Sequence, residues 1–69
     1  MERQFTDSSM ISSIGYDASN SILEVEFSSG VIWQYYDFPE SQWYEFESSG
    51  SKGKYSHTEI KDQFTGSQV

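Results

Sequence analysis

The chain has 69 residues and no cysteine, which leaves room for one small domain and excludes disulfide bonds and thiolate metal clusters. Eleven acidic and four basic residues give a net charge of −7, which repels polyanions such as nucleic acids at long range. Aromatic residues make up 17% of the chain, so we expect them to supply most of the core.

The two ends of the chain lack a hydrophobic pattern. Residues 1–7 and 65–69 are polar, so we expect flexible tails on either side of one domain at residues 8–64. The first residues contain no apolar signal segment, and the longest apolar run, Val31 to Trp33, is far shorter than the ~20 residues that cross a membrane. We therefore expect a cytoplasmic protein with no membrane partner.

Three strands are predicted in the first half of the chain. They are residues 10–16, 22–27 and 31–36, joined by a polar turn at 17–20 and a loop at 28–30. The second strand has the clearest signal, because its apolar residues alternate with Glu24 and Glu26 on the opposite face. Gly30 supplies the positive φ that a three-residue hairpin loop needs.

The alternation also predicts how these strands pair. The second and third strands should pair Phe27 with Val31, Val25 with Trp33, and Leu23 with Tyr35. The first and second should pair Tyr16 with Ser21, Ile14 with Leu23, Ser12 with Val25, and Met10 with Phe27. This arrangement places one apolar face toward the core and leaves open whether the mixed second face is covered.

Two helices are predicted after the sheet. Pro39 suits a first helical turn, and a stripe of Pro39, Trp43, Phe46 and Gly50 predicts a helix at about 39–49 that lies on the sheet. Ser56 and Glu59 form a capping-box pattern before a short second helix. The fold class is therefore α+β: a three-stranded antiparallel meander packed by one helix, with a short C-terminal helix.

The aromatic run Trp33 to Tyr36 is the first candidate site, because rings on a sheet can stack on unpaired bases. A core role for Trp33 and Tyr35 is favoured, since they share the apolar face. Tyr36 is the better surface candidate, although Glu24 and Glu26 share its face and would repel phosphates.

The second candidate is the glycine and lysine segment at residues 50–55. Its spacing does not match the Walker pattern, which excludes a nucleoside triphosphatase of that kind. Lys52, Lys54 and Lys61 could still form an anion site with the amides of a helix that begins after Ser56. The alternative is a helix stop with solvated lysines.

Catalysis has little support in the sequence. His57 is the only histidine, and the serines lack the Gly-x-Ser-x-Gly turn of a strained nucleophile. Glu24 and Glu26 alone are a poor basis for a metal site. We expect a protein that is not an enzyme and that uses no cofactor.

From Ser8 to Phe64 the chain resembles the KTSC domain family, a short module found at the C-terminus of some lysyl-tRNA synthetases and as free-standing bacterial and phage proteins. The matching residues are Ile14-Gly15-Tyr16-Asp17, Leu23-x-Val25-x-Phe27-x-x-Gly30, Phe38-Pro39, Ser51-Lys52-Gly53-Lys54-Tyr55 and Ile60. The family's central Tyr-x-Tyr is Trp33-Gln34-Tyr35 here. The resemblance implies no established activity, and RNA binding is an inference from attachment to a synthetase.

The sequence favours a small non-catalytic binding module. The candidate contact residues are Lys52, Gly53, Lys54, Tyr55, His57, Lys61 and Tyr36. RNA is one candidate partner. The alternative is a protein-interaction or self-associating module that uses the second sheet face, where Ile22, Ile32 and Tyr36 lie.

Overall fold

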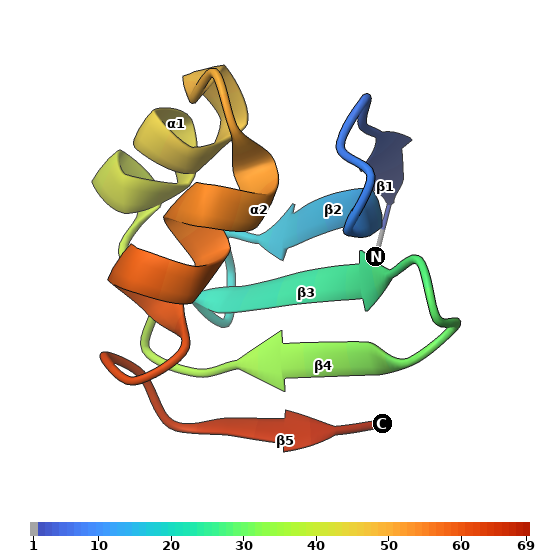
Figure 1. Cartoon of the computed structure of the whole chain (residues 1–69). Coiled ribbons are helices and arrows are strands. Elements are labelled where there is room, and N and C mark those ends of the chain that lie inside the picture. The colour runs from blue at the N-terminus through green and yellow to red at the C-terminus, as the bar shows by residue number, and fades with distance from the viewer. Residues whose placement is uncertain (1) are drawn as a thin grey trace.

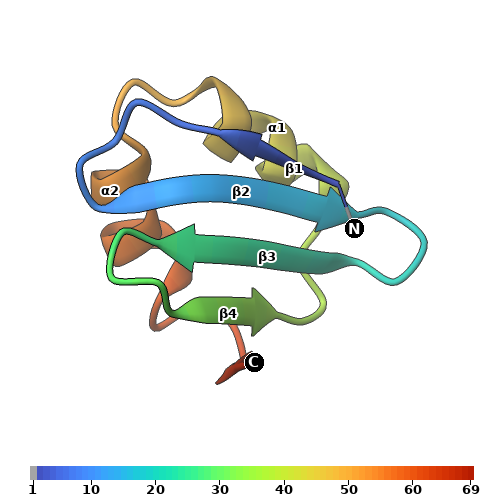
Figure 2. The same cartoon turned by 90° about the vertical axis from the view of Figure 1, so that its right-hand side faces the viewer.

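A computed structural model describes residues 2–69 as one antiparallel sheet with helices on one of its faces (Figure 1). The strands are β1 (Arg3–Phe5), β2 (Ile11–Asp17), β3 (Ile22–Phe27), β4 (Ile32–Tyr35) and β5 (Gly66–Gln68), and each pairs with the next along the chain. The helices are α1 (Glu40–Ser48), α2 (Lys52–Tyr55) and the π-helix η1 (Ser56–Ile60). Seen face on, the sheet has no helix in front of it (Figure 2).

The α+β class is confirmed, but the prediction of three strands is wrong in number. Short strands β1 and β5 extend the sheet at its two edges, with Arg3 opposite Gly15 and Ser67 opposite Gln34. A three-residue edge strand with one partner carries almost no alternation, so the pattern could not reveal it. The mobility expected for residues 1–7 and 65–69 stays a prediction.

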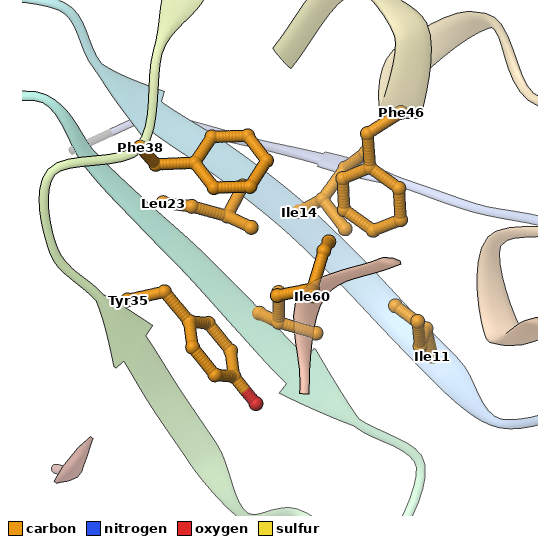
Figure 3. Close-up of a cluster of buried hydrophobic side chains, with 8 residues drawn as sticks. Ile11, Ile14, Leu23, Tyr35, Phe38, Phe46 and Ile60 are labelled. Atoms are coloured by element: carbon orange, nitrogen blue, oxygen red, sulfur yellow. The ribbon is translucent and has the colours of Figure 1, made fainter. Parts of the chain in front are cut away.

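The core lies between the sheet and the helices (Figure 3). Its fully or nearly fully buried members are Ile11, Ile14, Leu23, Val25, Tyr35, Phe38, Phe46 and Ile60. Phe38 is in the segment between β4 and α1, and its ring centroid is 4.7 Å from that of Phe64. Trp43 of α1 stacks on Tyr16 of β2 with centroids 5.5 Å apart, so Trp43 and Phe46 of the predicted stripe pack on the sheet. Pro39 and Gly50, the other two members of the stripe, are exposed and lie outside α1.

The predicted register of β3 and β4 is confirmed. Val25 lies opposite Trp33 and Leu23 opposite Tyr35, while the Phe27 amide donates to the Val31 carbonyl at 2.8 Å. Gly30 in the connecting turn has a φ of 95°, a conformation that L side chains rarely adopt. Strict alternation on both strands fixed this pairing.

The predicted register of β2 and β3 is wrong by two residues, because the connecting turn begins one residue later than expected. Asp17 is the last residue of β2, and its carboxylate accepts from the backbone amides of Ser19, at 3.0 Å, and Asn20. Ile14 therefore lies opposite Val25 instead of Leu23. The side-chain bonds of the turn, rather than the strand pattern, decide the register.

An irregularity between Ile11 and Ser13 reverses the faces at the start of β2. As a result Ile11 is fully buried in the core, although the alternation predicted it on the second face. Met10, which was expected opposite Phe27 on the core face, is 54% exposed. One extra residue in the strand accounts for both differences.

The second helix begins earlier than the capping-box pattern predicts. Ser51 is the N-cap, and its Oγ accepts from the Lys54 amide at 3.3 Å. Ser56 lies inside the helix, where its carbonyl accepts from the Lys61 amide in a π-helical bond of 2.9 Å. Gly53 is in the first turn of α2. A Cβ there would lie 3.1 Å from Met10 Sδ, so the residue is small because another chain segment is close. None of the described helices has the length and apolar character needed to cross a bilayer.

Candidate functional site: an aromatic groove beside the C-terminal helix

A groove of about 520 Å³ lies between the core face of the sheet and the end of the second helix. Its apolar lining comes from Met10, Phe27, Trp33, Tyr35 and Phe64. Polar groups at His57, Lys61 and Asp62 complete one side, and Gly53, Ser56 and Gly66 contribute to the remainder. A concave, mostly apolar surface with a few polar groups is the usual form of a ligand site in proteins.

Trp33 and Tyr35 form the strand side of this groove. They are alternate residues of β4 and therefore share a face, with ring centroids 6.1 Å apart and planes at 19°. Gly66 of β5 lies against the Tyr35 ring, since a Cβ at that position would be 2.6 Å from Cδ1. The core role predicted for Tyr35 is confirmed by its 5% exposure, whereas Trp33 is only half-buried beside the core and offers surface to the groove.

The Tyr35 hydroxyl has no hydrogen-bond partner among residues 2–69, although the other four tyrosines each have one. Figure 3 shows this hydroxyl at the edge of the cluster, pointing away from Phe38 and Phe46. Burial of the ring raises the pKa of the Tyr35 phenol above its ordinary value of 10.0, because the phenolate is poorly solvated there.

We expect the shifted phenol to make stability fall at alkaline pH. The folded-state pKa of Tyr35 is above the unfolded one, so its contribution is complete below about pH 10 and is lost as the pH rises through the folded-state pKa. Urea unfolding between pH 8 and 11 measures this loss. Tyr35→Phe should flatten the decline, and adding Tyr55→Phe should flatten it further, because burial also raises the pKa of Tyr55. An equally steep decline in Tyr35→Phe would contradict the assignment.

A lysine and a histidine lie on the helix side of the groove. His57 and Lys61 are exposed, are four residues apart on one helical face, and form no salt bridge with any described residue. Lys54, also exposed, precedes His57 by three residues on the same face. By contrast, Arg3 Nε lies 3.4 Å from Glu24 Oε2, and Lys52 Nζ donates to the Ser49 carbonyl at 2.7 Å. The groove therefore has unpaired positive charge in an acidic protein.

The acidic side chains gather elsewhere. Glu24 and Glu26 lie on the sheet face that no helix covers, and three further acids, Glu40, Glu45 and Glu47, are on α1. Asp62 is the one carboxylate in the groove lining. The lining of the groove thus carries less negative charge than a net charge of −7 would suggest.

The predicted contact residues do not form one site. His57 and Lys61 line the groove and Gly53 lies at its base, but Lys54 is beside it rather than in its lining. The Tyr55 ring stacks on Phe46 with centroids 5.3 Å apart, and its hydroxyl donates to Glu45 Oε1 at 3.2 Å.

Lys52 and Tyr36 lie outside the groove altogether. Lys52 borders a separate polar hollow of about 450 Å³ between α1 and the segment after β1. Tyr36 is on the opposite sheet face, where its hydroxyl is 2.7 Å from Ser67 Oγ. The predicted use of helix amides after Ser56 is wrong, because the helix does not begin there.

The sequence interpretation missed the apolar half of the groove. Trp33 and Tyr35 carried a usable signal, the aromatic-x-aromatic pattern on a core-facing strand, but that pattern cannot show whether a helix covers the rings completely. Met10 and Phe64 carried none, since their positions depend on the bulge in β2 and on the π turn. Among residues 2–69, no three His, Asp or Glu side chains lie close enough to share a metal ion.

Three comparisons place this geometry among known proteins. The profile of the KTSC domain matches residues 7–64. A crystal structure of a KTSC domain protein from Yersinia pestis has a TM-score of 0.95 and 38% identity, covering 99% of this chain and 96% of that one. An uncharacterized protein from Stutzerimonas stutzeri is 36% identical over 63 residues, which are 91% of this chain and 89% of that protein.

A lysine–tRNA ligase from Nostoc is 35% identical over 63 residues, which are 91% of this chain but 11% of the ligase. The chain thus spans about a tenth of the ligase relatives that it matches. The family profile covers most of the chain, and the Stutzerimonas and Yersinia proteins match 91% and 99% of it at more than 30% identity. This chain therefore belongs to the KTSC domain family.

Proposed function

We propose that the chain is a non-catalytic binding module that holds single-stranded RNA in the aromatic groove. The observation that carries the proposal is a groove of about 520 Å³ with the half-buried Trp33 ring on one side and the unpaired Lys61 ammonium, near His57, on the other. An unpaired base can stack on an aromatic ring while its phosphate lies near a cation. A flat, anionic ligand matches both sides of this groove.

The charge distribution supports an anionic ligand at this place. A net charge of −7 repels RNA at long range, so binding is expected to be weak and confined to the surface around Lys61. The ligase relatives give separate support, since proteins named for a reaction on tRNA contain a similar segment. That support depends on the ligase to which the similar segment is attached, whereas the groove is a property of this chain.

The absence of catalysis is part of the proposal. His57 is exposed and has no hydrogen-bonded carboxylate or hydroxyl partner among the described residues, which a general base would need for orientation. The groove supplies stacking, one phenol and positive charge, which suit binding. We place this binding in the cytoplasm, because a chain without cysteine has no disulfide bond that a reducing compartment would break.

We expect short single-stranded RNA to shift the Trp33 indole NMR signal and to leave that of Trp43 unchanged, because Trp43 stacks on Tyr16 away from the groove. With one phosphate contact, at Lys61, affinity should fall about 3-fold between 50 and 200 mM salt. Lys61→Ala should weaken binding and reduce the salt slope by about 0.7.

Lys52→Ala is the matched control for this titration, since the Lys52 ammonium is bonded to a backbone carbonyl outside the groove. Equal losses in Lys52→Ala and Lys61→Ala would contradict the location of the site. No shift of Trp33 at low salt and millimolar RNA would contradict RNA binding itself.

The alternative function, protein contact or self-association through the uncovered sheet face, has one observation in its favour: no helix covers that face (Figure 2). The face is largely polar, however. Glu24 pairs with Arg3 and accepts from Gln34 Nε2 at 3.0 Å, and Glu26 accepts from Ser13 Oγ at 3.0 Å. Side chains that satisfy one another in this way need no partner, so the groove is the better candidate.

A further inference from the structure

We propose that Tyr35 selects the base: its hydroxyl hydrogen-bonds to the edge of the nucleobase that stacks in the groove. This inference rests on the proposed function and goes beyond it, because stacking on Trp33 would accept any base whereas a hydrogen bond distinguishes one edge pattern from another. The sequence favours a core role for Tyr35 over base stacking, so the proposal gives a second role to a residue whose ring is already needed for packing.

The first observation is that Tyr35 combines the deepest burial with the least satisfied hydroxyl. It is 5% exposed, the most buried of the five tyrosines. The hydroxyls of Tyr16 and Tyr55 bond to the Phe38 carbonyl and to Glu45, and those of Tyr36 and Tyr44 also have partners. Among the described tyrosines, only Tyr35 therefore leaves its hydroxyl free for a partner from outside the chain, either water or a ligand.

The second observation is that this hydroxyl is open to the groove. Among the described residues, Arg3 Nη1 is the one fully enclosed side-chain polar atom that lacks a partner, so the Tyr35 oxygen retains accessible surface. Tyr35 lines the groove, and Figure 3 shows its oxygen directed away from the packed rings of Phe38 and Phe46. A ligand that enters the groove can therefore reach it.

The third observation is that the direction of the hydroxyl is fixed before any ligand arrives. The ring is held by Gly66 on one edge and by the near-parallel Trp33 ring beside it. A group held in place by packing loses little freedom when it forms a hydrogen bond, which favours discrimination between ligands. A phenol can both donate and accept a hydrogen bond, so the geometry identifies Tyr35 as the discriminating residue but does not identify the preferred base. The preferred base has to be measured.

The test compares wild type, Tyr35→Phe and Tyr36→Phe with hexamers of A, C and U at 50 mM salt, following the Trp33 indole signal. Tyr35→Phe removes only the hydroxyl, and Tyr36→Phe removes one from the next residue on the opposite face. Wild type should separate its best and worst hexamers by about 3- to 10-fold, the effect of one hydrogen bond. Tyr35→Phe should bring them within 2-fold by weakening the best, and Tyr36→Phe should preserve the wild-type ratio.

Each other result has a defined meaning. If Tyr35→Phe keeps the wild-type ratio, or if wild type binds all three hexamers equally, base selection by Tyr35 is wrong while RNA binding stands. If no hexamer shifts Trp33, both proposals fall. A hexaglutamate peptide serves as a polyanion without bases: if it binds the groove as tightly as the best hexamer, the site is a general anion site and selection by Tyr35 is again wrong.

Discussion

Phe46→Ala should remove a large part of the protein's stability and lower its urea midpoint by more than about 1 M. Phe46 is the fully buried anchor of α1, and its ring stacks on Tyr55 of α2, so one side chain holds both helices to the sheet. Truncating a buried Phe to Ala costs about 3–5 kcal/mol. A domain of this length has a total stability of about 3–10 kcal/mol, so this single change removes much of it.

Urea unfolding followed by far-UV circular dichroism measures the effect. Tyr44→Ala is the matched control, because Tyr44 is an aromatic residue of the same helix that is 57% exposed, and its loss should change stability by about 0.5 kcal/mol or less. A midpoint for Phe46→Ala within about 1 M urea of wild type would contradict the assignment of Phe46 as an anchor, since small domains lose about 1 kcal/mol per molar urea or more.

Gly15→Ala should detach β1 from the sheet. A Cβ at residue 15 would lie 2.6 Å from the Glu2 carbonyl oxygen and 2.7 Å from Arg3 Cγ, and the first of these is backbone that cannot rotate away. The Arg3 side chain lies across this glycine on its way to Glu24, so the ion pair should be lost with the strand. We expect a cost of about 1–3 kcal/mol, in the range of other overpacking changes.

Amide hydrogen exchange of β1 and of its partner β2 reports the detachment, together with urea unfolding. Gly50→Ala is the control, because nothing lies within 4 Å of a Cβ at residue 50 and the backbone there is not left-handed. Wild-type exchange rates in Gly15→Ala would show that β1 is not held by this contact. The same experiment on wild type measures the mobility predicted for residues 1–7 and 65–69.

Alternation predicted the pairing of β3 with β4 because this pairing depends on two local features, the alternation within each strand and the short turn between them. In β3 and β4 every second residue must face the core, and the short Gly30 turn allows one register, so Val25 opposite Trp33 followed from the sequence. The helix on the sheet followed in the same way from Trp43 and Phe46.

The features that were missed depend on contacts between distant residues. The bulge that buries Ile11 accommodates one extra residue in β2, and the hydrophobic pattern of the sequence does not predict this bulge. The early start of α2 depends on the capping bond of Ser51, whereas the capping-box pattern in the sequence lies at Ser56. The edge strands are too short for any periodic signal, and their pairing is set by the strands beside them.

The candidate site was half predictable for the same reason. His57 and Lys61 were found because charge and helical spacing are visible in a sequence. The groove itself is the space that packing leaves between β4 and the second helix, and residues such as Met10 and Phe64 enter it only after the chain has folded. A hydroxyl without a partner, as at Tyr35, can be recognised only when all its neighbours are known.

The π turn at Ser56–Ile60 also affects how this chain should be aligned with its relatives. Closing a helical turn with a bond from the Lys61 amide to the Ser56 carbonyl takes one residue more than an α-helical turn. A relative that lacks this turn would be one residue shorter here without losing any contact with the sheet. Counting forward from its lysine and glycine segment would then place the equivalent of Lys61 one position too far along, on a different side of the helix. In such a relative, the groove-facing cation should be identified by superposition and not by residue count.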